Sequence, residues 1–131
     1  MIVVDASALL ELLLGTARAA QIGARALSPD QRLHAPHLLD VEIVQALRRL
    51  VRLGDIDAER AEQALEDLEN LVIERYSHQE LLARVWQLRE SMTAYDGAYV
   101  ALAEALDAPL LTCDAKLARS HGHGAIIELQ A

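Results

Sequence analysis

The chain has no phenylalanine, one tryptophan and three tyrosines among its 131 residues. Aliphatic side chains and alanine must therefore supply most of the core, and a hydrophobic content of 53% excludes a largely disordered chain. The single cysteine, Cys113, cannot form an internal disulfide, which is typical of a reducing compartment. No apolar run approaches the roughly 20 residues of a membrane span, and the N-terminus lacks the basic leader of a secretory signal. The composition predicts a soluble, cytoplasmic protein with one domain over residues 1–131.

Basic residues are outnumbered, and all but one of them are arginine. The net charge of −8 argues at first against a nucleic-acid partner, because proteins that bind phosphate usually carry basic patches. However, residues 55–74 alone hold eight acids and one base, Arg60, so the rest of the chain is almost neutral. The charge therefore does not exclude a phosphate-containing substrate.

Short β-like runs alternate with helical stretches along the whole chain. The expected strands are Ile2–Asp5, Arg32–Ala35, Leu71–Tyr76, Pro109–Thr112 and Ala125–Leu129. The expected helices are Ala6–Leu14, Thr16–Leu27, His37–Leu53, Asp57–Asn70, His78–Glu90, Ala94–Leu106 and Ala115–Ser120. This alternation predicts an α/β fold with a central parallel sheet of about five short strands and helices on both faces.

Two aspartates follow predicted strands directly: Asp5 after the first and Asp114 after the fourth. Because the carboxyl ends of parallel strands share one edge of a sheet, both side chains are expected on that edge. Each also has a purely structural explanation, since Asp at a helix N-cap accepts hydrogen bonds from free backbone N–H groups. Asp96 has the same alternative in a capping box with Thr93, and Glu42 could lie on a solvated helix face.

Four acids converging on one sheet edge would repel one another unless a cation neutralised them. Carboxylate oxygens are hard ligands, and Mg²⁺ or Mn²⁺ is the usual ion in such a site. The sequence therefore offers two explanations for Asp5, Asp96 and Asp114, capping or metal binding, and the metal explanation also accounts for Glu42.

Three segments carry a family resemblance that extends over nearly all of the chain. They are "VVDASALL", "APHLLDVEIVQALRRL" and "YDGAYVALAEALDAPLLTCD", of which the last is the most specific. With these segments the chain resembles a PIN-domain ribonuclease of the VapC toxin type. The resemblance implies a three-layer PIN-like fold and a bacterial toxin that cleaves RNA to leave a 5′-phosphate and a 3′-hydroxyl. It also implies a VapB-type antitoxin partner and a homodimer.

The resemblance assigns the family's acidic quartet to Asp5, Glu42, Asp96 and Asp114, which would hold one or two Mg²⁺ ions. Ser7 and Thr112 match hydroxyl positions that border the site in the family. Many relatives carry asparagine at the position of Gln45 and a small residue at that of Cys113. Gln45 is therefore a candidate to line the site and alter how substrate or water is held.

The other polar residues of interest have structural explanations. The five histidines are expected at the surface, and Cys113 is expected to be a buried thiol at a strand end rather than a nucleophile. Tyr95 and Tyr99 are expected to pack in the interior rather than stack on bases. The acidic helix Asp57–Asn70 is expected to be solvated and to lie away from the site.

Two other classes of function remain as alternatives to a metal-dependent endoribonuclease. The first is a catalytically silent RNA- or protein-binding module on the same fold, which would not need four convergent acids. The second is a phosphoryl-transfer domain. A phosphatase of that kind requires Asp-x-Asp after the first strand, where this chain has Ser7, and a receiver domain requires an acidic pair at that position and a lysine after a late strand.

Overall fold

Five parallel strands form one sheet in the order β3-β2-β1-β4-β5 in the computed structural model, which describes residues 1–130. The strands are β1 (Ile2–Val4), β2 (Leu33–Pro36), β3 (Ile73–Tyr76), β4 (Leu110–Thr112) and β5 (Ile127–Leu129). The chain first moves outward from β1 through β2 to β3, and then returns to the other side of β1 for β4 and β5. The strand order therefore reverses between β1 and β4, which is where α/β sheets open a crevice for ligands.

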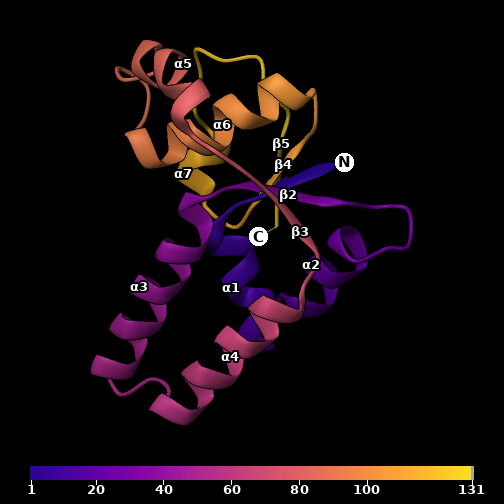
Figure 1. The fold of residues 1–131 in the computed structure, drawn as a ribbon, viewed down its shortest axis with the longest axis vertical. Helices are drawn as coiled ribbons and strands as arrows, with labels where there is room; N and C mark the ends of the chain where they lie inside the picture. Colours follow the sequence, from indigo (N-terminus) through magenta and orange to yellow (C-terminus); the bar gives the residue numbers. More distant parts are fainter. Residues whose placement is uncertain (131) are drawn as a thin grey trace.

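Helices cover both faces of the sheet, as the alternating pattern predicts. One layer holds α1 (Ala6–Leu14), α2 (Ala19–Ala26), α3 (Leu38–Arg52) and α4 (Ala58–Asn70). The other holds the 3₁₀ turn η1 (Gln79–Leu81), α5 (Leu82–Gln87) and α6 (Ala94–Leu106), and the short α7 (Ala115–Ala118) lies against β4 and β5. Figure 1 shows α3 and α4 extending away from the sheet on one side, with α5 and α6 packed together on the other.

The central strands are buried because helices cover them from both sides. All of β1 is inaccessible to solvent, and Leu110 and Leu111 of β4 are equally buried. Helix α6 packs against β1, β2 and β4 and is buried from Gly97 to Ala103. The fold therefore holds the ends of β1 and β4 and the start of α6 in fixed relation to one another.

Most expected elements are confirmed to within one or two residues, and two differ more. The second helix begins at Ala19 rather than Thr16, because Gly15 ends α1 in the left-handed region (φ 64°) and Thr16 starts a turn in which its carbonyl accepts from Ala19 N–H. The helix expected over roughly His78–Glu90 is shorter: the 3₁₀ turn η1 continues directly into α5, which ends at Gln87, and Leu88 at the C-cap is buried.

The acidic helix α4 packs on α1 and α3 through Ala61, Ala64 and Leu68. Its glutamates at positions 59, 62, 66 and 69 are exposed, which confirms that this helix is solvated. Across the described residues, the structure contains no helix with the length and apolarity that a membrane crossing requires.

Candidate active site

The two strand-end aspartates lie at the point where the strand order reverses. Asp5 follows β1, and its N–H donates to the carbonyl of Leu111 in β4, which places it beside Thr112 at the end of that strand. Asp114 follows Thr112 after one residue and begins α7. The expectation that both carboxylates share one edge of the sheet is therefore confirmed.

Asp5 is almost completely buried (6% exposed) and is held by three donors. Its Oδ1 accepts from Ser7 Oγ at 2.7 Å and from Ala8 N–H at 2.9 Å, while Oδ2 accepts from the hydroxyl of Thr112. Both hydroxyls also accept backbone N–H groups, Ser7 from Cys113 at 3.0 Å and Thr112 from Asp114 at 3.0 Å. Ser7 and Thr112 therefore join the ends of β1 and β4 through the Asp5 carboxylate.

The other two acids come from helices that approach this edge. Asp96 lies in the first turn of α6, whose N-cap Thr93 accepts its N–H at 3.2 Å. Glu42 lies in the second turn of α3, and its Oε1 accepts a hydrogen bond of 2.5 Å from the hydroxyl of Tyr99. Tyr99 follows Asp96 by three residues, so both lie on the same face of α6. Tyr99 thus connects Glu42 to the helix that carries Asp96.

Electrostatic coupling shows that the four acids form one group. Burial raises the pKa of Asp5, and the charge of Asp114 adds to that rise. Burial likewise raises the pKa of Glu42, with further contributions from Asp5 and Asp96, although the Tyr99 hydrogen bond acts in the opposite direction. The pKa of Asp96 is also raised, by burial and then by Asp114 and Asp5. A bound cation would offset both the burial of these charges and the smaller repulsion between them.

One cation acts on this group: Lys116, the chain's only lysine. Its charge opposes the rise in the pKa of Asp96, and its N–H donates to Asp114 Oδ1 at 2.9 Å.

The four carboxylates are suitable ligands for a divalent ion, although their side chains are not arranged around a common point. Among residues 1–130, no three histidine, cysteine or acidic side chains are arranged as a ready metal cage. Within the same residues, Glu42 accepts a protein donor on Oε1 alone, Asp114 accepts one on Oδ1 alone, and the Asp96 carboxylate accepts none. Asp5 Oδ2 accepts one hydrogen bond and so retains a lone pair. Each acid can therefore offer oxygen to an ion that draws the group together.

The capping explanation is also correct for the two strand-end acids. Asp5 caps α1 by accepting from Ala8 N–H, and Asp114 caps α7 by accepting from Lys116 N–H. Capping and metal binding were alternatives in the sequence, but the structure makes them compatible because each cap engages a single carboxylate oxygen.

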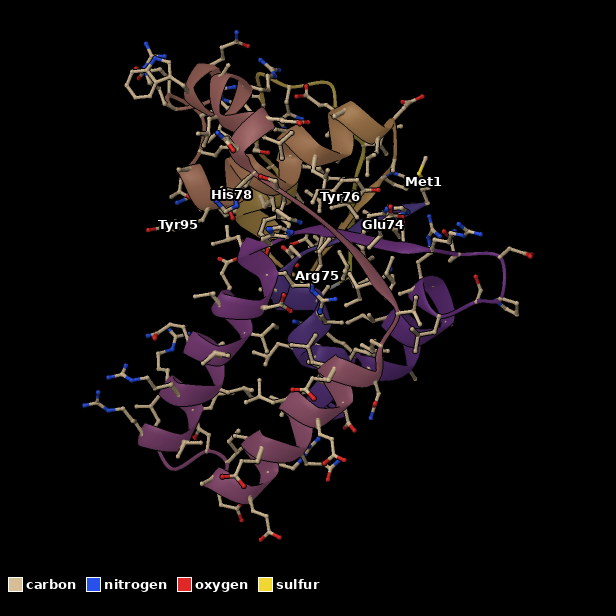
Figure 2. The ribbon with its side chains drawn as sticks, viewed as in Figure 1. Met1, Glu74, Arg75, Tyr76, His78 and Tyr95 are labelled. Atoms are coloured by element: carbon tan, nitrogen blue, oxygen red, sulfur yellow. The ribbon has the colours of Figure 1, made fainter. Side chains whose placement is uncertain are left out.

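A groove on α3 includes both Glu42 and Gln45. It has a volume of about 380 Å³, begins at Glu42 and is lined by Leu38, Val41, Gln45, Ala46, Arg49 and Tyr95. Figure 2 shows Tyr95 directed outward near His78, and its side chain is 62% exposed. The expectation that Tyr95 packs in the interior is therefore wrong, whereas that for Tyr99 (2% exposed) is confirmed.

Two other expectations need correction. His34 is buried (3% exposed) instead of lying at the surface, because β2 is an inner strand of a sheet covered on both faces. Its Nδ1 is 2.7 Å from the Tyr76 hydroxyl, and burial lowers its pKa. Cys113 is half-buried rather than buried.

The role of Tyr99 as a donor to Glu42 was missed in the sequence. Its spacing of three residues from Asp96 was the available signal, since that spacing places both on one helix face.

Comparison with known proteins identifies one family by sequence and the same fold by structure. The model of the PIN domain family matches residues 2–121. Ribonuclease VapC1 of Mycobacterium tuberculosis is 47% identical over 121 residues, covering 92% of this chain and 90% of that protein. Ribonuclease VapC12 of the same species is 43% identical over the full length of both chains. A crystal structure of VapBC2 from Rickettsia felis, bound to a DNA fragment from its promoter, matches with a TM-score of 0.71 over all of both chains at 13% identity, and so shares the fold.

Proposed function

The chain belongs to the PIN domain family, in its VapC group, and on that premise we propose that it is a divalent-metal-dependent endoribonuclease acting as one PIN domain. Asp5, Glu42, Asp96 and Asp114 would hold Mg²⁺, or Mn²⁺, at the reversal point of the sheet. The observation that carries this proposal is the gathering of these carboxylates at one edge of the sheet, where burial first and their mutual charge second raise the pKa of three of them. A helix cap or a solvated face does not require such an arrangement.

Different side chains of the protein would hold different parts of this site in place. Ser7 and Thr112 orient the buried Asp5 carboxylate from two sides, so that its remaining lone pair has a fixed direction. Tyr99 fixes Glu42 and favours its ionised form through a short hydrogen bond. Asp96 and Asp114 retain oxygens without protein donors among residues 1–130 and can adjust to the ion.

A divalent ion bound there would lower the pKa of a water molecule and stabilise charge that develops on the phosphate oxygens. The carboxylates that remain ionised beside it would accept the proton released when water attacks phosphorus. Lys116, at the edge of the group, would offset negative charge on the substrate.

In the cell we propose that the protein is the toxin of a VapBC-type module in the bacterial cytoplasm, with a VapB-type antitoxin as partner. Two observations support this proposal: the curated relatives are named VapC ribonucleases, and a protein of the same fold was crystallised as a VapBC pair. A homodimer is proposed on the same family basis.

The decisive experiment measures cleavage of purified bacterial RNA by the purified protein. With Mg²⁺ or Mn²⁺ we expect cleavage with 5′-phosphate ends, and with EDTA we expect none. Asp96→Asn should lose activity even with metal, while a matched change at an exposed acid on another helix, Glu59→Gln in α4, should retain it. Undiminished cleavage in EDTA by a preparation shown to be free of contaminating nuclease, with Asp96→Asn fully active as well, would exclude the metal mechanism.

A further inference from the structure

The outer face of α3 carries a cationic stripe that begins at the candidate active site. Glu42, Gln45, Arg49 and Arg52 follow one another at intervals of three, four and three residues, so they share one face of the helix. From Glu42 to Arg52 this face extends about 15 Å at the helical rise of 1.5 Å per residue. The stripe therefore leads from a site carboxylate to two arginines.

The charge of this face is opposite to that of the whole protein. The net charge is −8, yet the only acids of α3 are Asp40 and Glu42. Asp40 is neutralised by a bidentate pair with Arg75, at 2.7 and 2.8 Å, and Glu42 belongs to the site. Arg48, Arg49 and Arg52 are exposed and make no ion pair with any of residues 1–130. Figure 2 shows nitrogen-tipped side chains along the outer side of α3.

An exposed aromatic ring completes the surface. Tyr95 lines the groove together with Gln45 and Arg49, and it precedes Asp96 in the chain. Its ring is 62% exposed, unlike that of Tyr99 one turn later. Rings that stand in solvent beside cations are a common means of binding single-stranded nucleic acid, because bases stack on the ring and phosphates meet the cations.

We infer that this groove and stripe bind the single-stranded RNA next to the scissile phosphate, with a base stacked on Tyr95 and the following phosphates on Arg49 and Arg52. Gln45, between them, is placed to hydrogen-bond a base edge. The inference rests on the proposed function, and it commits to RNA because the groove begins at Glu42 and its free charges are all positive. A protein partner would not require a row of unpaired arginines that runs toward the carboxylates of the site.

Binding is measured separately from cleavage. Fluorescence anisotropy with a fluorescein-labelled, mixed-sequence 12-nucleotide RNA in EDTA reports affinity without metal, for wild type and variants in the same oligomeric state. Arg49→Gln with Arg52→Gln should weaken binding about tenfold and reduce the slope of log affinity against log salt by about 1.4. Tyr95→Ala should weaken it about tenfold, whereas Tyr95→Phe, which keeps the ring, should bind like wild type.

The control is Arg32→Gln, which removes one positive charge just before β2, at the opposite edge of the sheet, and should change neither affinity nor slope. Loss of affinity by the α3 variants, with Arg32→Gln unaffected, supports the inference. Binding by the α3 and Tyr95→Ala variants equal to wild type overturns it. It is also overturned if these variants lose only dimerisation or affinity for an antitoxin while RNA binding is unchanged.

The outcomes separate this inference from the proposed function. If wild type binds RNA through Arg49 and Tyr95 but cleaves nothing with Mg²⁺ or Mn²⁺, the surface is correct and the nuclease proposal fails. If wild type cleaves, and Tyr95→Ala retains the wild-type KM and kcat, the nuclease proposal stands and the surface is wrong.

Discussion

Removing the hydroxyl of Tyr99 tests how Glu42 is held in its ionised form. Tyr99→Phe leaves the buried ring in place and deletes only the donor of the 2.5 Å hydrogen bond to Glu42 Oε1. That bond lowers the pKa of Glu42 against the larger effect of burial. Its removal should therefore raise the pKa of Glu42 further, and a smaller fraction of the enzyme would carry the ionised carboxylate at a given pH.

The size of the effect follows from the partial burial of Glu42. Hydrogen bonds to charged groups contribute about 1.5–3 kcal/mol, and solvent screening at a half-buried carboxylate reduces this to about 1 kcal/mol. A loss of that size corresponds to a decrease in Tm of about 4 °C for a domain of this length. The acid side of the pH profile for kcat/KM should move to higher pH by about half a pH unit or more.

The assay compares RNA cleavage across pH for wild type, Tyr99→Phe and Tyr95→Phe. Tyr95→Phe is the matched control, because it removes an exposed hydroxyl from the same helix, four residues earlier. A Tyr99→Phe profile that coincides with the wild-type profile would refute this account of Glu42. A decrease in Tm without a pH shift would also refute it, because it would assign Tyr99 a structural role only.

Three further predictions concern the other acids. Asp114→Asn should keep the cap on α7, because Asn caps about as well as Asp. It should reduce turnover at least about tenfold, because it removes one of the four negative charges. If the variant remained fully toxic in growing cells, Asp114 would have a capping role only. Neutralising the exposed acids of α4 should leave cleavage nearly intact, and a large decrease in turnover by a folded triple variant would contradict the position of that helix. The variant carries Glu59→Gln, Glu62→Gln and Glu66→Gln. Asp5→Asn in EDTA should melt no lower than wild type at pH 7.5, because the folded-state pKa of Asp5 is raised and its buried charge destabilises the fold above that pKa. The difference in Tm should shrink as pH falls through the raised pKa, and a difference independent of pH would exclude charge as its cause.

The sheet edge could be predicted because it depends on local signals and one topological rule. Ile2–Val4 and Leu110–Leu111 are apolar runs that end before an acid, and parallel strands align their carboxyl ends. The start of α6 could also be predicted from the sequence, because Thr93 lies three positions before Asp96 in the pattern of a capping box. These signals placed Asp5 and Asp114 on one edge and Asp96 at the start of a helix, whereas the family resemblance assigned Asp96 to the same site.

The contacts between distant elements could not be predicted in this way. The bond from Tyr99 to Glu42 depends on the distance and rotation between α3 and α6, which no local pattern specifies. The burial of His34 depends on strand order: β2 lies between β1 and β3, and the register pairs His34 with Glu74 and aligns Tyr76 two residues further on. A histidine in an edge strand would have fitted the same sequence pattern and remained exposed.

Two of the four proposed metal ligands, Asp5 and Asp114, are also helix caps, and there is a physical reason for this. A strand that ends at the sheet edge is followed by a helix, and the first N–H groups of that helix need an acceptor at the position where a ligand must also stand. An aspartate meets both needs, because one oxygen of Asp114 accepts from Lys116 N–H and the other remains free. Asp5 differs in that both oxygens accept hydrogen bonds, two on Oδ1, where the cap lies, and one on Oδ2, which keeps a lone pair. Asparagine preserves the cap and removes the charge, so substitution at these positions separates stability from activity. An aspartate at a strand end can therefore cap a helix and bind a metal ion at once. A cap that also belongs to a metal site is distinguished from a simple cap by further carboxylates close enough to affect its pKa.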